Sequence, residues 1–307
     1  MIKTELSILI PTYNDVCIDL VRGLAKQCMA VKRLRYHILV ADDGSTDPAV
    51  IEANQAINGI LNCSYVLRGV NCGRAITRNW LAYQARHEWL LFIDADMSLE
   101  RDDFIQRYVE EDEEGGLLYG GYVVKGDEKE WKGNLRFRYE KKEEPKHTAE
   151  QREEHPYQDF HTSNFLIMRR HYVENLLDAR FKHYGYEDVL FGKVLQQKFI
   201  PIIHIDNPVA FARFEDNEHF VAKMEEGMRT LYEFRDELSG YSRLIDKKEK
   251  LERHHLLPVV RHIFNICKRH WRANLCGNNP SLFVFKLYKI GYYCSLHQRQ
   301  DSGKQEQ

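Results

Sequence analysis

The feature that most constrains the fold is an alternation of short apolar runs with longer stretches of helical periodicity. Four apolar runs, Leu6–Ile10, Tyr36–Ala41, Cys63–Leu67 and Trp89–Ile93, are typical of buried strands. Between them lie stretches such as Val16–Met29, whose apolar residues recur at helical spacing. Strands that alternate with helices in this way predict an α/β protein, with a parallel sheet covered by helices on both faces.

Polar residues gather where these predicted strands end, at 11–14, 42–47 and 94–96. In parallel sheets with helices on both faces, ligands bind beyond the carboxyl ends of the strands. The sequence therefore predicts a ligand site at this edge of the sheet.

The pattern changes in the middle of the chain. Leu117–Val124, Asn164–Met168 and Ile202–Ile205 are predicted strands, and 181–199 is predicted to be a loop followed by a helix. Residues 125–158 are rich in charge and poor in periodicity. They are predicted to form a long surface excursion that is partly mobile.

The C-terminal part has a different composition. An amphipathic helix is predicted at 217–238, and residues 250–299 hold nine Lys or Arg against one acid, Glu252, with aromatic residues between them. We therefore expect an α/β domain at 1–215 and a helical, basic and aromatic segment at 216–307. The DSGKQEQ end of this segment is predicted to be disordered.

Charge and composition exclude several classes of protein. The formal net charge of -2 argues against a protein that coats nucleic acid. The sequence contains no run of 18 or more apolar residues, so no membrane-spanning helix is expected. Seven cysteines occur singly, without a CxxC pair, which suits a reducing cytoplasm and not a zinc site. A cytoplasmic location is therefore expected.

The motif Asp94-Ala95-Asp96 follows the apolar strand that ends at Ile93. Two carboxylates two residues apart at a strand end can share one divalent cation, which can also bind a diphosphate. The alternative is a loop in which Asp96 caps the next helix. The position of the motif favours the metal.

Asp42 and Asp43 close the second predicted strand. A carboxylate there can accept a hydrogen bond from a base N–H such as uracil N3–H, although guanine offers N–H donors as well. Asp, Gly and Ser are also common turn residues, and Asp47 is a good helix cap. We assign Asp43 to the nucleotide and Asp47 to the turn.

Two further pairs carry charge at the starts of predicted helices. Arg74 and Arg78 lie four residues apart and share one helix face, which favours a diphosphate, although solvated arginine pairs are common on surface helices. Glu187 and Asp188 begin a later helix. A carboxylate there can take the proton of an acceptor hydroxyl, or can simply suit the helix dipole. From these residues alone both interpretations stay open.

Six segments taken together resemble the family 2 glycosyltransferases, in the family's order and over roughly the first two-thirds of the chain. The segments are SILIPTYN (7–14), VADDGSTD (40–47), NCGRAITRN (71–79), FIDADM (92–97), TSNFLIMRR (162–170) and YGYEDVLFGKVL (184–195). The resemblance implies a GT-A fold, a Rossmann-like mixed sheet with helices on both faces. It also implies inverting transfer from a nucleoside-diphosphate sugar to a hydroxyl group, with Mn²⁺ or Mg²⁺ as cofactor.

The resemblance also implies a donor site. Pro11 and Tyr13 match positions that line the base pocket, with Tyr13 stacking on the base, and Asp43 matches the acid that contacts the base. Arg78 matches a position near the diphosphate. The predicted donor-binding residues are Pro11, Tyr13, Asp42, Asp43, Arg74, Arg78, Asp94 and Ala95. A UDP-sugar is the favoured donor.

The reacting residues follow from the same resemblance. Asp188 matches the general base, and Glu187 would lie against the acceptor or the donor sugar. Asp94 and Asp96 match the contacts to the metal and the ribose-phosphate. Because burial near other acids disfavours ionisation, the pKa of Asp188 is expected to be raised.

The sequence departs from the family at one metal ligand. Many relatives carry a His after the strand that follows the Glu-Asp helix, and here that position falls near Phe211, which cannot bind a metal. His204 lies earlier and is only a weak candidate, because a lone His at a strand is more often a core residue. The departure puts strict metal dependence in question.

Two classes of function follow. The main expectation is a glycosyltransferase of surface polysaccharide or glycolipid synthesis, with a glycan or lipid-linked acceptor. The alternative is a non-catalytic nucleotide-sugar-binding protein or a partner subunit of a glycosyltransferase complex, against which Asp94, Asp96 and Asp188 argue. The basic C-terminal helices either lie on the anionic inner face of a bacterial membrane or pack on the catalytic domain. Nucleic acid is not an expected partner.

Overall fold

The computed structural model of the protein describes residues 3–112, 115–211 and 213–303. The chain divides into two compact units. The sheet unit contains Met1–Lys125, Glu144–Lys182 and Glu187–Arg213, and the helical unit contains Gly126–Glu143, His183–Tyr186 and Phe214–Gln307. Residues 126–143 thus belong to the same unit as the C-terminal helices, although they lie within 1–215, the range of the predicted α/β domain.

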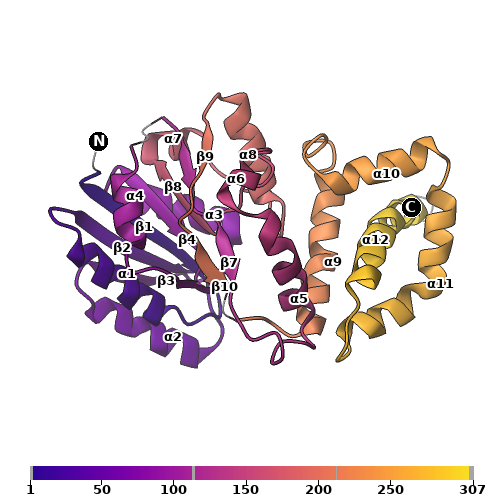
Figure 1. The fold of residues 1–307 in the computed structure, drawn as a ribbon, viewed down its shortest axis with the longest axis horizontal. Helices are drawn as coiled ribbons and strands as arrows, with labels where there is room; N and C mark the ends of the chain where they lie inside the picture. Colours follow the sequence, from indigo (N-terminus) through magenta and orange to yellow (C-terminus); the bar gives the residue numbers. More distant parts are fainter. Residues whose placement is uncertain (1–2, 113–114, 212, 304–307) are drawn as a thin grey trace. The chain divides into compact units, whose positions relative to one another are not determined.

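A seven-stranded sheet forms the centre of the sheet unit (Figure 1), with the strand order β3-β2-β1-β4-β8-β6-β9. The first four of these strands run parallel, β8 runs antiparallel to β4 and β6, and β9 is parallel to β6. The strands are β1 (Glu5–Thr12), β2 (Arg35–Asp42), β3 (Cys63–Leu67), β4 (Trp89–Ile93), β6 (Leu117–Tyr119), β8 (Asn164–Met168) and β9 (Ile202–His204). The predicted α/β class and mixed sheet are confirmed.

Helices cover both faces of this sheet, because its strands are apolar on both sides. On one face, α3 (Arg74–Gln84), α7 (Arg169–Glu174) and α8 (Glu187–Gln197) contribute to a single buried apolar cluster with the strands. On the other face, α1 (Ile18–Ala30) packs against α4 (Phe104–Glu110) (Figure 1). Burial of both faces explains why the strands read as continuous apolar runs.

Asp47 has the structural role that the sequence predicted. It precedes α2 (Pro48–Gln55), and its side chain accepts a hydrogen bond from the backbone N–H of Ala49 at 2.9 Å. This contact caps the helix and satisfies one of its unpaired N–H groups.

The predicted strand at 117–124 is in fact two strands that belong to different sheets. After β6, the chain leaves the large sheet and forms β7 (Tyr122–Val124) in a three-stranded sheet. There β10 (Val209–Phe211) pairs parallel with β7 and antiparallel with β5 (Met97–Leu99). The prediction of one continuous strand was therefore wrong.

Two glycines explain the break between β6 and β7. A Cβ atom on Gly120 would lie 2.3 Å from the carbonyl oxygen of Asn207, so only glycine allows this close approach. Gly121 has a φ of 77°, a backbone conformation that favours glycine. Together they let the chain turn out of the large sheet.

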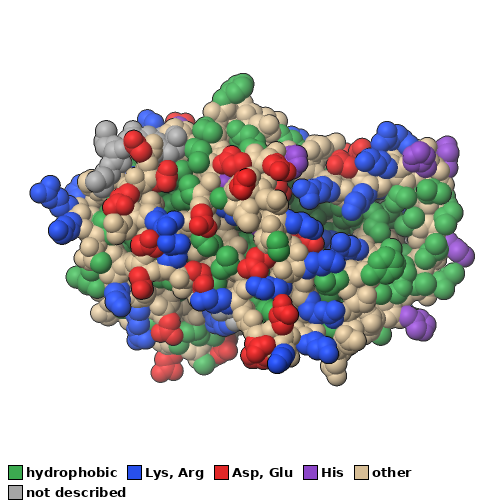
Figure 2. Space-filling model, in the orientation of Figure 1, with side chains coloured by type: hydrophobic (Ala, Val, Ile, Leu, Met, Phe, Trp, Pro, Cys, Tyr) green, Lys and Arg blue, Asp and Glu red, His purple; other side chains and the backbone are tan. Residues whose placement is uncertain are grey.

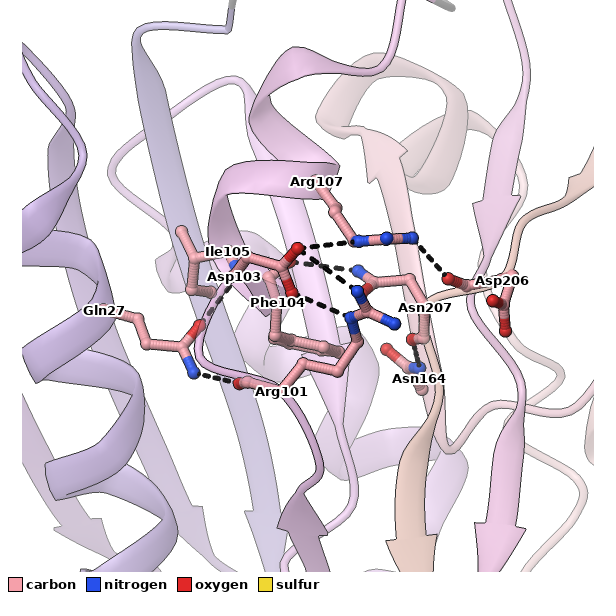
Figure 3. Close-up of polar contacts among 9 residues, drawn as sticks. All are labelled: Gln27, Arg101, Asp103, Phe104, Ile105, Arg107, Asn164, Asp206 and Asn207. Atoms are coloured by element: carbon pink, nitrogen blue, oxygen red, sulfur yellow. Dashed lines mark hydrogen bonds and ion pairs between the residues drawn. The ribbon is translucent and has the colours of Figure 1, made fainter.

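Asn164 holds this crossing between the two sheets in place. Its Nδ2 donates to the carbonyl oxygens of Gly121 at 3.0 Å and Asn207 at 2.9 Å, and its Oδ1 accepts from the Tyr108 hydroxyl at 2.8 Å. Asn207 in turn donates to the carbonyl oxygen of Phe104 at 3.0 Å (Figure 3). A fully buried amide thus satisfies backbone groups that the strand break leaves without ladder partners.

An ion-pair cluster braces the start of α4 beside this crossing (Figure 3). Asp103 accepts from Arg101 Nε at 2.8 Å and from Arg107 Nε at 3.0 Å. Arg107 also donates to the backbone oxygen of Asp206 at 2.9 Å. The chain that leaves β5 is therefore tied to the chain that enters β10.

The segment 125–158 contains more regular secondary structure than the sequence predicted. It contains α5 (Leu135–Glu143) and the short α6 (Ala149–Arg152), and Leu135, Phe137 and Arg152 are buried. The sequence analysis did not predict these helices, because the charge-rich composition hid their few buried anchors. Most of the segment is exposed or half-buried, as a surface excursion predicts.

The helical unit is built from α5 and four C-terminal helices: α9 (Asn217–Glu233), α10 (Arg243–Arg253), α11 (Leu257–Cys276) and α12 (Leu282–Gly303). Aromatic rings fill the space between α11 and α12, where Phe264 lies 5.4 Å from Tyr288 and a Cβ on Gly291 would come within 2.4 Å of the Phe264 ring. The start of the tail predicted to be disordered, 301–303, continues α12, and 304–307 lie outside the described residues. Among the helices of the described ranges, none combines the length and the apolar content that a bilayer crossing requires.

Candidate active site

The carboxyl ends of the parallel strands meet at one edge of the large sheet. Thr12 pairs with Asp42 and Asp42 pairs with Leu67, so the loops after β1, β2 and β3 start side by side. The Asp43 N–H donates to the oxygen of Thr12 at 2.8 Å, and the Arg68 N–H donates to the oxygen of Asp42 at 2.9 Å. The predicted ligand edge is therefore formed by segments far apart in the sequence.

Asp42 is buried and holds the turn that follows β2. Its carboxylate accepts the Ser45 N–H at 2.7 Å and the Tyr65 hydroxyl. Burial and this hydrogen bond raise the pKa of Tyr65, which therefore stays a donor. Both carboxylate oxygens of Asp42 are thus engaged inside the protein, which suits a turn-holding role at this predicted donor residue.

Asp43 anchors the loop that leads into α3. Its carboxylate accepts the backbone N–H groups of Cys72 and Gly73, the latter at 2.8 Å, and Arg68 Nη1 at 3.1 Å. Gly73 has a φ of 91°, and a Cβ there would meet the carbonyl oxygen of Lys182 at 3.2 Å. Asp43 therefore fixes the N-terminus of the helix that carries Arg74 and Arg78.

The loop after β1 presents the predicted base-pocket residues. Pro11 is half-buried in β1, and the ring of Tyr13 is 47% exposed. Asn14, at a φ of 50°, clamps this loop to the Asp42 turn, because its Oδ1 accepts the N–H groups of Thr46 at 2.8 Å and of Asp47 at 3.1 Å. An exposed aromatic residue thus lies on a loop that is hydrogen-bonded to the turn after β2.

Arg78 is a deeply buried charged side chain of the site, with 1% of its surface exposed, as is Asp42 with 0%. One Nη pairs with the carboxylate of Asp94, which follows β4. Within the described residues, no hydrogen-bond partner is found for its Nε and the other Nη. A buried guanidinium with unused donors beside a strand end can stabilise an oxyanion that enters the site.

Glu187 and Asp188, at the start of α8, complete the cluster. Glu187 is buried, and burial together with the charge of Asp188 raises its pKa, while Arg74 and Arg78 lower it in part. The charge of Arg78 also acts on Asp188. The structure therefore brings Arg74, Arg78, Glu187 and Asp188 into one electrostatic environment, which Asp94 joins through its ion pair with Arg78.

His161 is a site residue that the sequence analysis missed. Its Nδ1 lies 2.9 Å from Asp188 Oδ2, and the Val189 N–H donates to Asp188 Oδ1 at 2.8 Å. Burial alone would raise the pKa of Asp188, but the hydrogen bond and charge of His161, together with the Val189 N–H and the charge of Arg78, hold this pKa below its usual range. The expectation of a raised pKa at Asp188 was wrong, and the raised pKa belongs to Glu187.

The acids after β4 and after β1 approach each other near β10. Ala95 is buried, and the negative charge of Asp96 contributes to the raised pKa of Asp15, which is due first to burial. Arg213 pairs with Asp15 at 2.9 Å. A guanidinium therefore already balances part of the negative charge here.

The carboxylates of Asp94 and Asp96 fit a hard divalent cation that takes further oxygen ligands from a phosphate. No group of three or more His, Cys, Asp or Glu that could hold a metal occurs in the described parts of the chain. Phe211 pairs with Met97, directly after Asp96, and its ring packs on Tyr122 at 4.9 Å. The position near which a further His ligand was expected thus holds an apolar ring.

His204 does not serve as that ligand. Its Nδ1 accepts from Arg152 Nε at 2.9 Å, and its Nε2 lies 2.9 Å from the carbonyl oxygen of Pro156. Burial lowers the pKa of His204, so the ring is neutral and both nitrogens are engaged. The weak assignment of His204 to the metal is corrected to a core histidine.

Comparison with known proteins gives a family and a fold. The family model described as glycosyl transferase family 2 matches residues 7–177, and no curated protein matches the chain. The structure is similar to residues 1–349 of S. aureus TarS in complex with UDP, at 17% identity and a TM-score of 0.50 over 97% of this chain and 92% of that one. It is also similar to the mannosyltransferase PcManGT from Pyrobaculum calidifontis in complex with GDP-Man and Mn²⁺, at 13% identity and a TM-score of 0.52 over 95% and 85%.

The structure also matches part of a longer TarS chain. There the alignment covers 78% of this chain and 44% of that chain, at 18% identity and a TM-score of 0.49. The chain therefore spans less than half the length of that TarS chain.

Proposed function

The chain belongs to glycosyl transferase family 2 and has the GT-A fold, and we propose that it transfers a sugar from a nucleoside-diphosphate sugar to a hydroxyl group with inversion. One observation carries this proposal. Arg78, with unused donors, lies buried against Asp94, and its charge reaches the carboxylate of Asp188, which is itself hydrogen-bonded to His161. A site for a departing diphosphate and a site for proton removal thus share one cluster.

The donor side rests on the strand-end loops. The exposed ring of Tyr13 offers a stacking face for a base, and the Asp43 carboxylate, which orders the loop before α3, lies at the same edge. A UDP-sugar is the favoured donor, since an acid at this edge suits uracil N3–H. The TarS fragment was solved with UDP, whereas the archaeal mannosyltransferase was solved with GDP-Man.

The acceptor side rests on Asp188. A carboxylate with a lowered pKa is ionised at neutral pH, so it can accept the proton of the acceptor hydroxyl as that oxygen attacks the anomeric carbon. His161 holds Oδ2 of Asp188, which fixes the direction of the carboxylate. Arg78 and Arg74 stabilise the negative charge that builds on the departing diphosphate.

Asp94 and Asp96 are the residues that would hold Mn²⁺ or Mg²⁺. A divalent cation there supplies Lewis-acid stabilisation of the diphosphate charge. Since both carboxylates are hard oxygen donors, the remaining ligands would come from the donor phosphates and water.

The cellular role is proposed at a coarser level. We place the reaction in surface polysaccharide or glycolipid synthesis in the cytoplasm, with a glycan or lipid-linked acceptor. The acid-free stretch 253–300 supports contact with the inner face of the membrane.

A binding screen tests the donor assignment. Thermal unfolding is followed with UDP-sugars, GDP-sugars and the matching nucleoside monophosphates, each with and without Mn²⁺. A donor present at about one hundred times its Kd should stabilise the fold by about 2.7 kcal/mol, and the monophosphate control should stabilise it less.

The outcomes separate the two functional classes. Stabilisation by one donor together with release of its nucleotide in the presence of acceptor supports the transferase. Stabilisation without any turnover, by transfer or hydrolysis, would instead favour a non-catalytic nucleotide-sugar-binding protein. No response to any nucleotide sugar would contradict both.

A further inference from the structure

An apolar stripe runs along the exposed face of the start of α11. Leu256, Val259, Ile263 and Ile266 are spaced by three, four and three residues, so they lie on one side of the helix. Between 45% and 64% of each side chain is exposed. The opposite side of the helix is buried and carries Phe264. The stripe is therefore a second apolar face on a helix that already has a packed one.

Hydrophobic side chains gather over this part of the helical unit, at the right of Figure 2, with histidines at their margin. The exposed margin residues on α11 are His262, Arg269 and His270, and Arg253 is exposed at the end of α10. An exposed apolar patch with a polar rim often marks an interaction site, whereas single exposed apolar residues need no such explanation.

The surrounding sequence has an extreme charge balance. From Arg253 to Gln300 the chain contains eight Lys or Arg, five His and no Asp or Glu. Some of these cations are used inside the helical unit, since Arg261 donates to the oxygen of Cys294 at 2.9 Å and Arg272 lies 3.4 Å from Glu225. Arg253 and Arg269 have no such contact within the described residues.

We propose that this face of α11 docks the protein on an anionic lipid surface. The stripe would lie at the boundary between the headgroups and the acyl chains, and the arginines would lie against lipid phosphates. An amphipathic helix in the plane of the interface binds through both of these contributions. The inference concerns the helical unit and does not depend on the proposed transferase activity, although it would bring the chain to a lipid-linked acceptor.

Charge favours a membrane, and not a second copy of this chain, as the partner that covers the stripe. Two copies that met through α11 would bring basic margins together, and α11 has no acid to pair with them. Anionic headgroups supply the missing negative charge at the margin of the stripe. A bilayer also accepts an apolar face of any outline, so no complementary shape is needed.

Sedimentation with vesicles tests the proposal on the full chain. Vesicles of phosphatidylcholine alone are compared with vesicles of equal parts phosphatidylcholine and phosphatidylglycerol. The protein should pellet with the anionic vesicles, release as salt is raised, and bind neutral vesicles about tenfold more weakly, because several cations contribute.

Variants assign the binding to the stripe and its margin. The double variant Ile263→Asp/Ile266→Asp should weaken partition into anionic vesicles by about tenfold or more, and Arg269→Glu should weaken it several-fold. Leu61→Asp is the control, since Leu61 is an apolar residue of the sheet unit that is at least as exposed, at 69%. Circular dichroism and nucleotide-sugar binding show whether each variant is folded.

Two results would overturn the proposal. One is a failure of the vesicle test, either because the wild-type protein stays in the supernatant with anionic vesicles or because the double variant pellets as well as the wild type. The other is a concentration-dependent dimer in sedimentation velocity that the double variant abolishes, which would identify a second copy as the occupant. Failure of donor binding in the wild type would count against the transferase and leave this test unaffected.

Discussion

The two units of the molecule use charge in opposite ways. In the sheet unit, Arg78 and Glu187 are buried, and each has specific charged neighbours. In the helical unit, the space between α11 and α12 is filled by rings such as Phe264, and Arg269 faces the solvent. Burying charge is costly unless it is paired, so a fold retains such charges where they contribute to binding or chemistry. Substitutions in the first cluster should therefore change rates, and substitutions in the second should change stability.

The largest effect is expected from Asp188→Asn. The amide keeps an acceptor for the Val189 N–H but cannot take a proton, so transfer should fall by about 10²- to 10⁴-fold with little change in melting temperature. Donor binding and initial rates are measured together. Asp19→Asn, at a surface carboxylate that is 91% exposed, is the control. Full activity of the Asp188→Asn variant would mean that another group is the base.

The corresponding change in the helical unit is Phe264→Ala. Phe264 is 3% exposed and its ring contacts Tyr288 and Trp271, so its loss should lower the free energy of unfolding by about 3–5 kcal/mol. Urea denaturation measures the change. Phe283→Ala, on the same pair of helices but at a side chain 70% exposed, should change stability by about 0.5 kcal/mol or less. Equal effects at the two positions would show that the ring cluster does not support this unit.

His161→Gln tests whether a neighbour tunes the base. Because His161 holds the pKa of Asp188 below its usual range, its loss should raise that pKa. Asp188 would then be protonated at higher pH, so the acidic limb of the plot of kcat against pH should shift to higher pH. Below that limb, kcat should fall about tenfold for each unit by which the pKa rises.

The matched control for this profile is His219→Gln. His219 forms the same kind of pair with Asp216, at 2.6 Å, on the surface of the helical unit. That substitution should leave the pH profile in place. An unchanged profile for His161→Gln would remove His161 from the site and leave it a structural residue.

The smallest effect is expected from Phe211→His, which introduces a nitrogen ligand on the strand paired with Met97, the residue after Asp96. Since Phe211 pairs with Met97, an imidazole there can reach the same edge as the two carboxylates. The Mn²⁺ concentration for half-maximal activity should fall by several-fold, up to about tenfold. Phe211→Leu controls for loss of the ring contact with Tyr122. An unaltered Mn²⁺ requirement would place the cation away from β10.

The strands of the parallel half could be predicted because each is a short apolar run that both faces of the sheet bury. β4 matches its predicted range, and β2 extends the predicted 36–41 by one residue at each end. The strand at 117–124 could not be divided from the sequence alone. Its break depends on the approach of Asn207 to Gly120, two residues far apart in the chain.

Candidate site residues could be named from the sequence where charge follows a strand, as at Asp94, or opens a helix, as at Arg78 and Asp188. The acids after β2 and β4 were found because strand ends point to ligands. The ion pair between Arg78 and Asp94 and the bond from His161 to Asp188 depend on which elements are neighbours, which no local pattern encodes. The direction of the pKa shift at Asp188 was missed for the same reason, since the imidazole that contributes most to lowering it lies on another segment.

The reversed direction of β8 has a consequence for how such a site can diversify. Because β8 runs against β4, the residues just before it arrive beside Asp94, as the pairing of Ile93 with Asn164 shows. The loops assigned to the donor all come from the chain before β5, and the proton-accepting pair is encoded after residue 160. A genetic crossover between these stretches would join the donor-binding loops of one parent to the proton-accepting residues of another. The large sheet, to which both stretches contribute strands, would hold them together.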